Sequence, residues 1–328
     1  MSSGPDLIAT KNSMKGSGLP PPPKWSDMKT LDQKIVWLIT RGIRPLLSKT
    51  GNALSTTSYT QASQASSDIA DTADTLGGIP DEILREIFGW LPGKDIARAS
   101  AICRRFRIAI DDDPLLSFKK SGNYFGQKDW EEYFGDVGVE PPLPEDIVEI
   151  LKAPCPVFNS EGKDAGLKVK DTHFLTLIPA AINGDPLTLD LIRELVKSPK
   201  NGGNAIKYEY YYPENHNSTP VSKSHWMLMS KDVIPNSKGK SYLEQLKLLP
   251  SGHEAPHLID AVVSIFMHYV HTKERLFSDN PLTYTRCQEK NSSGKYQMST
   301  GGFSGSGLFV CTYDFIRHRI GLCVSRKF

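Results

Sequence analysis

The amino-acid sequence predicts an α+β protein, in which a polar tail and a small all-helical unit precede a larger mixed body. Residues 77–118 show helical periodicity without any strand-like run. Residues 125–328 contain β-rich runs and amphipathic segments that neither alternate strictly nor segregate, as expected of a mixed α+β domain. Residues 1–76 are expected to be disordered, because the Ser-, Thr- and Gln-rich stretch at 49–76 cannot offset the entropy of ordering.

Length and composition exclude several classes of protein. With 328 residues, 39% of them hydrophobic, and a formal net charge of +2, most of the chain should fold, and nucleic acid is not expected as a partner. The five cysteines form no C-x-x-C pair, which argues against a disulfide framework or zinc site and indicates a reducing compartment. No apolar run approaches the roughly 20 residues of a membrane span, and no signal-peptide core is visible, so a cytoplasmic location without a transmembrane segment is expected.

The tail contains two segments of distinct character. The run LPPPPK at 19–24 predicts a stiff polyproline II spacer. Residues 31–48 form a short basic amphipathic segment, in which Pro45 interrupts any long helix. This segment could pack on the folded body or lie on a membrane surface.

The helical unit is predicted to contain two helices joined by a Pro-Gly turn at 92–93. The apolar residues of the first helix, with Trp90, cover an arc of about 160° on a helical wheel, whereas a helix on one core needs about 100°. The second helix is expected to begin near Asp95 and to keep one apolar side through Cys103 as far as Ile110. A unit this small is rarely stable alone, so the excess apolar surface predicts a partner.

The stretch IPDEILREIFGWLPGKDIARASAICRRFRIAIDDDPLL resembles an F-box. The places of the family's motif are held by Ile79-Pro80, Leu91-Pro92, Asp95-Ile96, Ser100, Ile102-Cys103, Arg104 to Phe106 and Asp113-Pro114. The departures are mild: isoleucine replaces the opening leucine and the valine before the cysteine, and Ser117-Phe118 lies near where tryptophan is common.

The resemblance implies an adaptor. F-box proteins dock onto the Skp-type subunit of cullin–RING (SCF) ubiquitin ligases, while the rest of the chain recruits a target to the ubiquitin-conjugation pathway. It implies no catalytic residue, cofactor or metal. The residues implied to contact the adaptor are Ile79, Pro80, Ile83, Leu84, Ile87, Phe88, Leu91, Pro92, Ile96, Ile102, Cys103 and Phe106.

The body is predicted to contain short strands between amphipathic helices. The longest helix, 256–272, is apolar nearly all round, which predicts a central helix covered by sheet. The strand-like runs are 173–178, 207–212, 225–229, 282–287, 308–313 and 320–324, and the other helices are 144–152, 188–197 and 241–249.

Some residues of the body resemble parts of enzyme sites. The glycine-rich run at 301–307 places Ser306 where a hydrolase elbow needs its second glycine, so we expect a flexible hairpin loop. His268, His271 and Glu274 outline a metal site, but solvated histidines at a helix end are the preferred interpretation. A nucleophilic pair could be formed by Cys155 or Cys287 with His173, His225 or His268, although no spacing favours one combination.

Segments of the body, among them HWMLMSKDVIPNSKGKSY and MHYVHTKERLFSDNPLTYTRCQEK, resemble an uncharacterised domain family of chlamydia-related intracellular bacteria. That resemblance implies a secreted effector that recruits a host ubiquitin ligase in the host cytosol. The first hypothesis is therefore a substrate-recruiting F-box protein without activity of its own. The alternatives are a Cys- or His-dependent enzyme addressed to a ligase by the F-box, and a packing motif whose Ile83, Ile87 and Phe88 are buried against the body.

Overall fold

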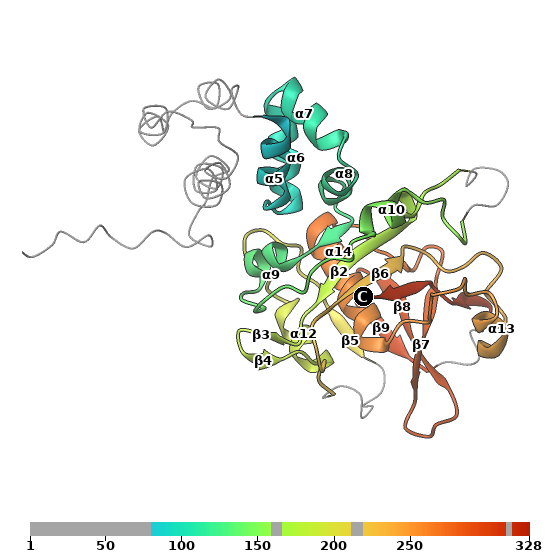
Figure 1. Cartoon of the computed structure of the whole chain (residues 1–328). Coiled ribbons are helices and arrows are strands. Elements are labelled where there is room, and N and C mark those ends of the chain that lie inside the picture. Colours follow the sequence, from blue (N-terminus) through green and yellow to red (C-terminus); the bar gives the residue numbers. More distant parts are fainter. Residues whose placement is uncertain (1–79, 159–165, 211–218, 313–316) are drawn as a thin grey trace, which may run out of the picture.

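The computed structural model describes residues 80–158, 166–210, 219–312 and 317–328, in which a helical unit is joined to a mixed body (Figure 1). This arrangement confirms the predicted α+β class. The expectations for residues 1–76, and the place of Ile79, lie outside the described ranges.

The helical unit consists of four helices: α5 (Asp81–Gly89), α6 (Gly93–Ile102), α7 (Arg104–Asp111) and α8 (Pro114–Lys120). The prediction of one continuous second helix is wrong, because Cys103 adopts an extended conformation (φ −150°, ψ 164°) between α6 and α7. The break lets α7 pack against both α5 and α6. Apolar residues at helical spacing occur in a straight helix and in a broken one, so the pattern does not distinguish them.

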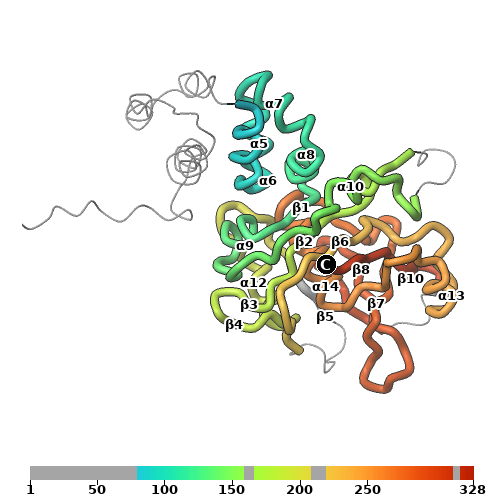
Figure 2. The backbone as a smooth tube through the Cα atoms, viewed as in Figure 1, coloured from blue at the N-terminus to red at the C-terminus, as the bar shows by residue number. Residues whose placement is uncertain are grey.

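Helix α8 connects the unit to the body. The Asp113 carboxylate accepts hydrogen bonds from the backbone N–H groups of Leu115 and Leu116 (2.9 and 3.0 Å), which caps the start of α8. Leu116 belongs to the core of the unit, whereas Phe118 belongs to the core of the body. Figure 2 shows α8 leading into the body, where it contacts α10 (Ile147–Lys152) and β1 (Tyr124–Phe125).

The body is built around two larger sheets and a short β3–β4 pair (Ala181–Ile182 and Asp185–Pro186). The four-stranded sheet has the order β1, β2 (His173–Ile178), β6 (His225–Ser230) and β11 (Ser325–Lys327). The five-stranded sheet has the order β10 (Ile320–Gly321), β7 (Tyr284–Lys290), β8 (Gln297–Ser304), β9 (Gly307–Cys311) and β5 (Tyr208–Tyr210).

The central helix α14 (Leu258–Thr272) contacts strands of both larger sheets, and every residue from 260 to 270 is buried. The prediction of a central helix covered by sheet is therefore confirmed. The other helices of the body are α9 (Gln127–Tyr133), α11 (Val169–Thr172), α12 (Leu189–Leu195), α13 (Tyr242–Leu246) and the 3₁₀ turn η4 (Arg317–Arg319).

Each predicted strand run overlaps an observed strand. The prediction of a flexible loop at 301–307 is wrong for its first half, which belongs to strand β8. Gly301 and Gly302, expected in a flexible loop, lie within β8, and the hairpin turn is only Gly305-Ser306. Gly301 has φ +148°, and a Cβ atom there would lie 2.3 Å from the Thr283 carbonyl oxygen. Glycine is needed at this position because the neighbouring strand passes too close for a side chain.

Candidate protein-docking interface

The helical unit has a hydrophobic core of its own. All members of this core come from residues 83–116, so Ile83, Ile87 and Phe88 pack within the unit and not against the body as the packing alternative requires. The Phe88 ring packs edge-on against Phe106, with ring centroids 5.2 Å apart. The predicted adaptor contacts that lie buried here are Leu84, Ile87, Phe88, Leu91, Pro92, Ile96 and Phe106. Their part in a partner contact stays a prediction.

The other predicted contacts that the structure describes are exposed or half-buried. Pro80 is exposed at the start of α5, and Ile83 is half-buried one turn later. Trp90, at the end of α5, is 57% exposed and lies seven residues after Ile83, so the two project from the same side of the helix. We call Pro80, Ile83 and Trp90 the docking stripe. Ile102 and Cys103 are half-buried between α6 and α7.

The sequence wheel included Trp90 in its wide apolar arc, but Trp90 was not among the predicted contacts. The structure separates that arc into two parts. Leu84, Ile87 and Phe88 face the core, while Ile83 and Trp90 remain at its exposed margin. The signal in the sequence was the width of the apolar arc of α5, which exceeds what a helix needs to pack on one core and therefore indicates exposed apolar residues.

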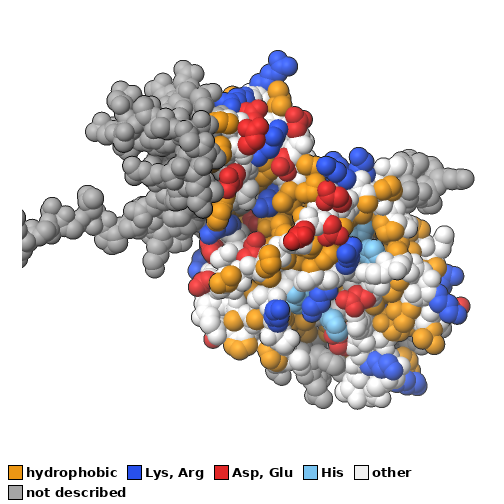
Figure 3. Space-filling model, viewed as in Figure 1, with side chains coloured by type: hydrophobic (Ala, Val, Ile, Leu, Met, Phe, Trp, Pro, Cys, Tyr) orange, Lys and Arg blue, Asp and Glu red, His pale blue; other side chains and the backbone are white. Residues whose placement is uncertain are grey.

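Charged residues surround the docking stripe. The Asp81 carboxylate forms a salt bridge with Arg105 (2.7 Å), which links the start of α5 to α7. Glu82 and Glu86 are exposed on α5. On the face shown in Figure 3, acidic and basic side chains are interspersed over the helical unit. The stripe is therefore an apolar strip with a polar rim, the usual composition of a protein interface.

Lys119, in the last turn of α8, lies between α5 and strand β1 of the body. Lys119 is 8% exposed; its ammonium group donates to the Gly89 carbonyl (2.9 Å) at the C-terminal end of α5 and lies 4.4 Å from the centre of the Tyr124 ring. Burial lowers the pKa of Lys119, against the opposing effects of nearby carboxylates.

A second contact holds the start of α6. Lys94 forms an ion pair with Glu132 of α9. Gly93 has no room for a side chain, since a Cβ atom would lie 2.5 Å from the Lys119 carbonyl oxygen and 3.0 Å from the His271 ring. These contacts were not predicted, because residues far apart in sequence make them. They hold the docking stripe in one orientation relative to the body.

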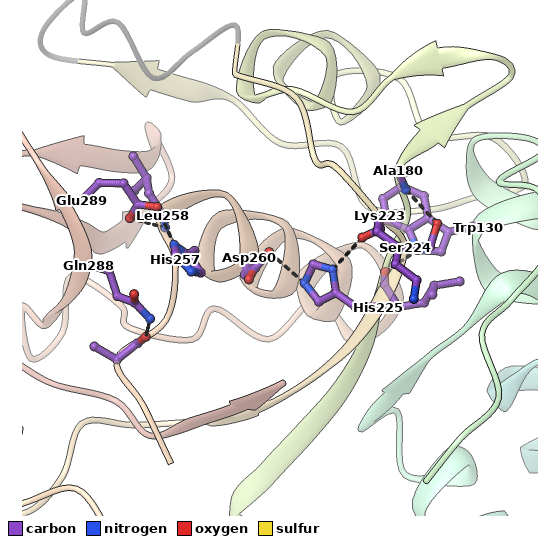
Figure 4. Close-up of polar contacts among 12 residues, drawn as sticks. Trp130, Ala180, Lys223, Ser224, His225, His257, Leu258, Asp260, Gln288 and Glu289 are labelled. Atoms are coloured by element: carbon purple, nitrogen blue, oxygen red, sulfur yellow. Dashed lines mark hydrogen bonds and ion pairs between the residues drawn. The ribbon is translucent and has the colours of Figure 1, made fainter. Parts of the chain in front are cut away.

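The candidate Cys/His pairs are not assembled. Cys155 and Cys287 are buried, and within the described ranges neither thiol is hydrogen-bonded to a histidine. Burial also raises the pKa of Cys287 well above its usual value, which keeps the thiol protonated and weakly nucleophilic. His225 instead lies between the Lys223 carbonyl (Nδ1, 2.9 Å) and the Asp260 carboxylate (Nε2, 3.2 Å), as Figure 4 shows.

The expectation of solvated histidines at the end of the long helix is wrong for His268. Its ring is 3% exposed, and Nε2 lies 3.0 Å from a carboxylate oxygen of Glu274. The reason is that α14 stays buried as far as Val270, so the ring enters the core and Glu274 reaches back to it. No group of His, Cys, Asp and Glu side chains in the described part of the chain could hold a metal ion.

We expect the buried side chain of His173 to make the stability of the protein depend on pH. Its ring is buried, and burial lowers its pKa from 6.5 to about 3. Between these values the unfolded chain binds a proton that the folded chain does not, so the free energy of unfolding must fall as the pH falls. The wild type is expected to lose about 2 kcal/mol from this group between pH 7 and pH 5.

Urea unfolding of the wild type and of His173→Gln across this range measures the effect. The variant should show the flatter pH dependence, even if it is less stable throughout. His318→Gln, at an exposed histidine, is the matched control and should run parallel to the wild type. Parallel curves for His173→Gln and the wild type would contradict the assignment.

Comparison with known proteins identifies the helical unit. Residues 76–119 match the family model described as F-box-like, and the match ends one residue before the end of α8. No curated protein and no solved structure matches the chain. Among the described residues, no helix is long and apolar enough to cross a membrane. The chain thus contains an F-box-like domain, a protein-interaction module of the adaptor type, at the position where the sequence predicted an F-box.

Proposed function

We propose that the protein is a substrate-recruiting subunit of an SCF-type ubiquitin ligase. Its helical unit binds the Skp-type adaptor, and its α+β body holds the protein that is to be ubiquitinated. The observation that supports this function most strongly is the F-box-like match over residues 76–119. No catalytic activity of the protein itself is needed for this role.

The geometry of the unit supports docking by its surface. The core residues keep the helices in place, and the docking stripe offers a partner exposed apolar side chains, including one tryptophan. Tryptophan is over-represented among the residues that contribute most to binding. The polar junction at Lys119 and Lys94 would hold the body, and so the target, at a defined position relative to the ligase.

We further propose a host setting for this activity. The resemblance of the body to a domain family of chlamydia-related bacteria supports a secreted effector that acts in the cytosol of a eukaryotic host. In that setting the adaptor and the target both belong to the host, and the protein exploits a ligase that its own cell lacks.

Co-elution with the adaptor tests the proposed function. The full chain and a purified eukaryotic Skp-type adaptor are mixed and separated by size-exclusion chromatography with light scattering. We expect a 1:1 complex that also retains the cullin subunit when it is added. Separate elution of a folded chain and a folded adaptor at micromolar concentrations would refute the proposal.

A further inference from the structure

The docking stripe leads to a second exposed apolar residue, which belongs to the body. Helix α5 runs toward the body (Figure 1), and the Gly89 carbonyl at its end accepts a hydrogen bond from Lys119. Trp90 therefore lies at the end of the stripe that is nearest the body. Val139, in the loop that follows α9, is 91% exposed. Trp90 and Glu140, the residue after Val139, line the same small cavity, so the stripe and this loop are neighbours.

Hydrogen bonds hold the loop of Val139 in place. The Gln127 side-chain amide, on α9, donates to the Gly138 carbonyl (2.9 Å), and the backbone N–H of Gln127 donates to the Glu140 carboxylate (2.6 Å). The backbone N–H of Gly138 donates to the Asp136 carboxylate (2.8 Å). These bonds lie on both sides of Val139. A side chain presented by a loop that is already ordered can be covered by a partner at a small cost in conformational entropy.

The cavity beside Trp90 has room for about one side chain. Its volume is about 110 Å³, whereas pockets for small ligands usually measure about 300–1,000 Å³. Both parts of the protein line it: Gly89, Trp90, Leu91 and Lys119 from the helical unit, and Tyr124, Gln127, Lys128, Asp129 and Glu140 from the body. The cavity therefore suits the end of one side chain of a docked protein better than a free small molecule.

The charged groups of the cavity favour a basic side chain. Its two carboxylates are Asp129 and Glu140, and its two lysines are Lys119 and Lys128, of which Lys128 forms an ion pair with Glu131 (2.8 Å). Burial raises the pKa of both Asp129 and Glu140, although Lys119 acts on each in the opposite direction. A further cation would stabilise these carboxylates, and the exposed ring of Trp90 beside them is a favourable contact for an ammonium or guanidinium group.

We propose that the Skp-type adaptor contacts the body as well as the helical unit, by covering Trp90 and Val139 together. A lysine or arginine of the adaptor enters the cavity between the two parts and pairs with Glu140. This inference rests on the proposed function and extends its interface beyond the docking stripe. An adaptor held by both parts fixes the orientation of the body, and so of the target, relative to the ligase.

Calorimetric titrations of the full chain with a purified Skp-type adaptor test the contact with the body. Val139→Ser should weaken binding at least about fivefold, because the adaptor no longer buries the valine side chain. Leu243→Ser is the matched control: its side chain is 72% exposed on α13, away from the stripe, and the variant should bind within about twofold of the wild type.

A charge-neutralising variant tests the basic side chain. Glu140→Gln keeps an acceptor for the backbone N–H of Gln127 but removes the negative charge. Its binding should be at least about tenfold weaker at low salt, and should depend less steeply on salt than that of the wild type, because an ion pair with the adaptor is lost. Glu149→Gln, the same charge change at an exposed glutamate of α10, should keep both the affinity and the salt dependence of the wild type.

The proposed function and this extension can fail separately. No binding by a folded wild type would refute both. Binding by the wild type that neither Val139→Ser nor Glu140→Gln weakens would overturn the extension alone, and an unchanged salt dependence in Glu140→Gln would overturn the basic side chain. If Glu140→Gln disturbs the loop, Val139→Ser still decides the contact, because its side chain is 91% exposed and its replacement leaves the hydrogen bonds of the loop in place.

Discussion

Replacing Phe88 with alanine is expected to lower the free energy of unfolding of the helical unit by about 3–5 kcal/mol. Phe88 is 1% exposed, and it contributes the largest side chain of α5 to the unit's core, against Phe106 of α7. The cavity left by the ring would lie at the centre of a unit that contains few other large side chains. For so small a core, a loss of this size removes most of the stability that the unit can have.

Hydrogen exchange of the full chain measures this effect locally. Amides of α5, α6 and α7 should lose their protection in Phe88→Ala, while those of α14 keep theirs. Ile108→Ala removes an apolar side chain that is 46% exposed on α7, so it should change protection little. If the two variants behaved alike, the unit's own core could not be what holds its helices together.

Replacing Ile83 and Trp90 with serine is expected to weaken adaptor binding without unfolding the unit. The unit should stay folded, because both side chains lie at the margin of its core. Adaptor affinity should fall at least about thirtyfold, or about 2 kcal/mol, which is a common cost of losing one buried interface tryptophan. The contrast with Phe88→Ala separates residues that build the unit from residues that meet the partner.

Much of the fold could be predicted from local patterns. Strand β2 matches its predicted run residue for residue, because a short apolar run with β-branched and aromatic members has few alternatives. Helix α14 was recognised as central because it is apolar on every side. The break at Cys103 was not predicted, because it depends on how α7 packs against α5. The part of strand β8 that contains Gly301 and Gly302 was predicted to be a loop. Glycine is needed at Gly301 because the neighbouring strand lies close, and not because the chain turns there.

The position of the candidate interface could be predicted from the sequence, but its division into core and surface residues could not. The motif located the unit correctly, at residues matched by the F-box-like family. Sequence alone could not divide the apolar arc of α5 into core and surface, because that division depends on where α6 and α7 lie. Lys119 was also not predicted to be buried: a lysine in the last turn of a helix usually faces solvent, and here Gly89 and the Tyr124 ring, both contacts made in the tertiary fold, cover it.

The most direct test of the ligase-adaptor account is a calorimetric titration of the full chain with a purified Skp-type adaptor. Wild type is compared with Ile83→Ser/Trp90→Ser and with Leu243→Ser, which removes an apolar side chain that is 72% exposed on the body. The account predicts submicromolar binding by the wild type and by Leu243→Ser, and binding weakened at least about thirtyfold in the double variant. No binding by a folded wild type would contradict the F-box assignment, and undiminished binding by a folded double variant would contradict the docking stripe.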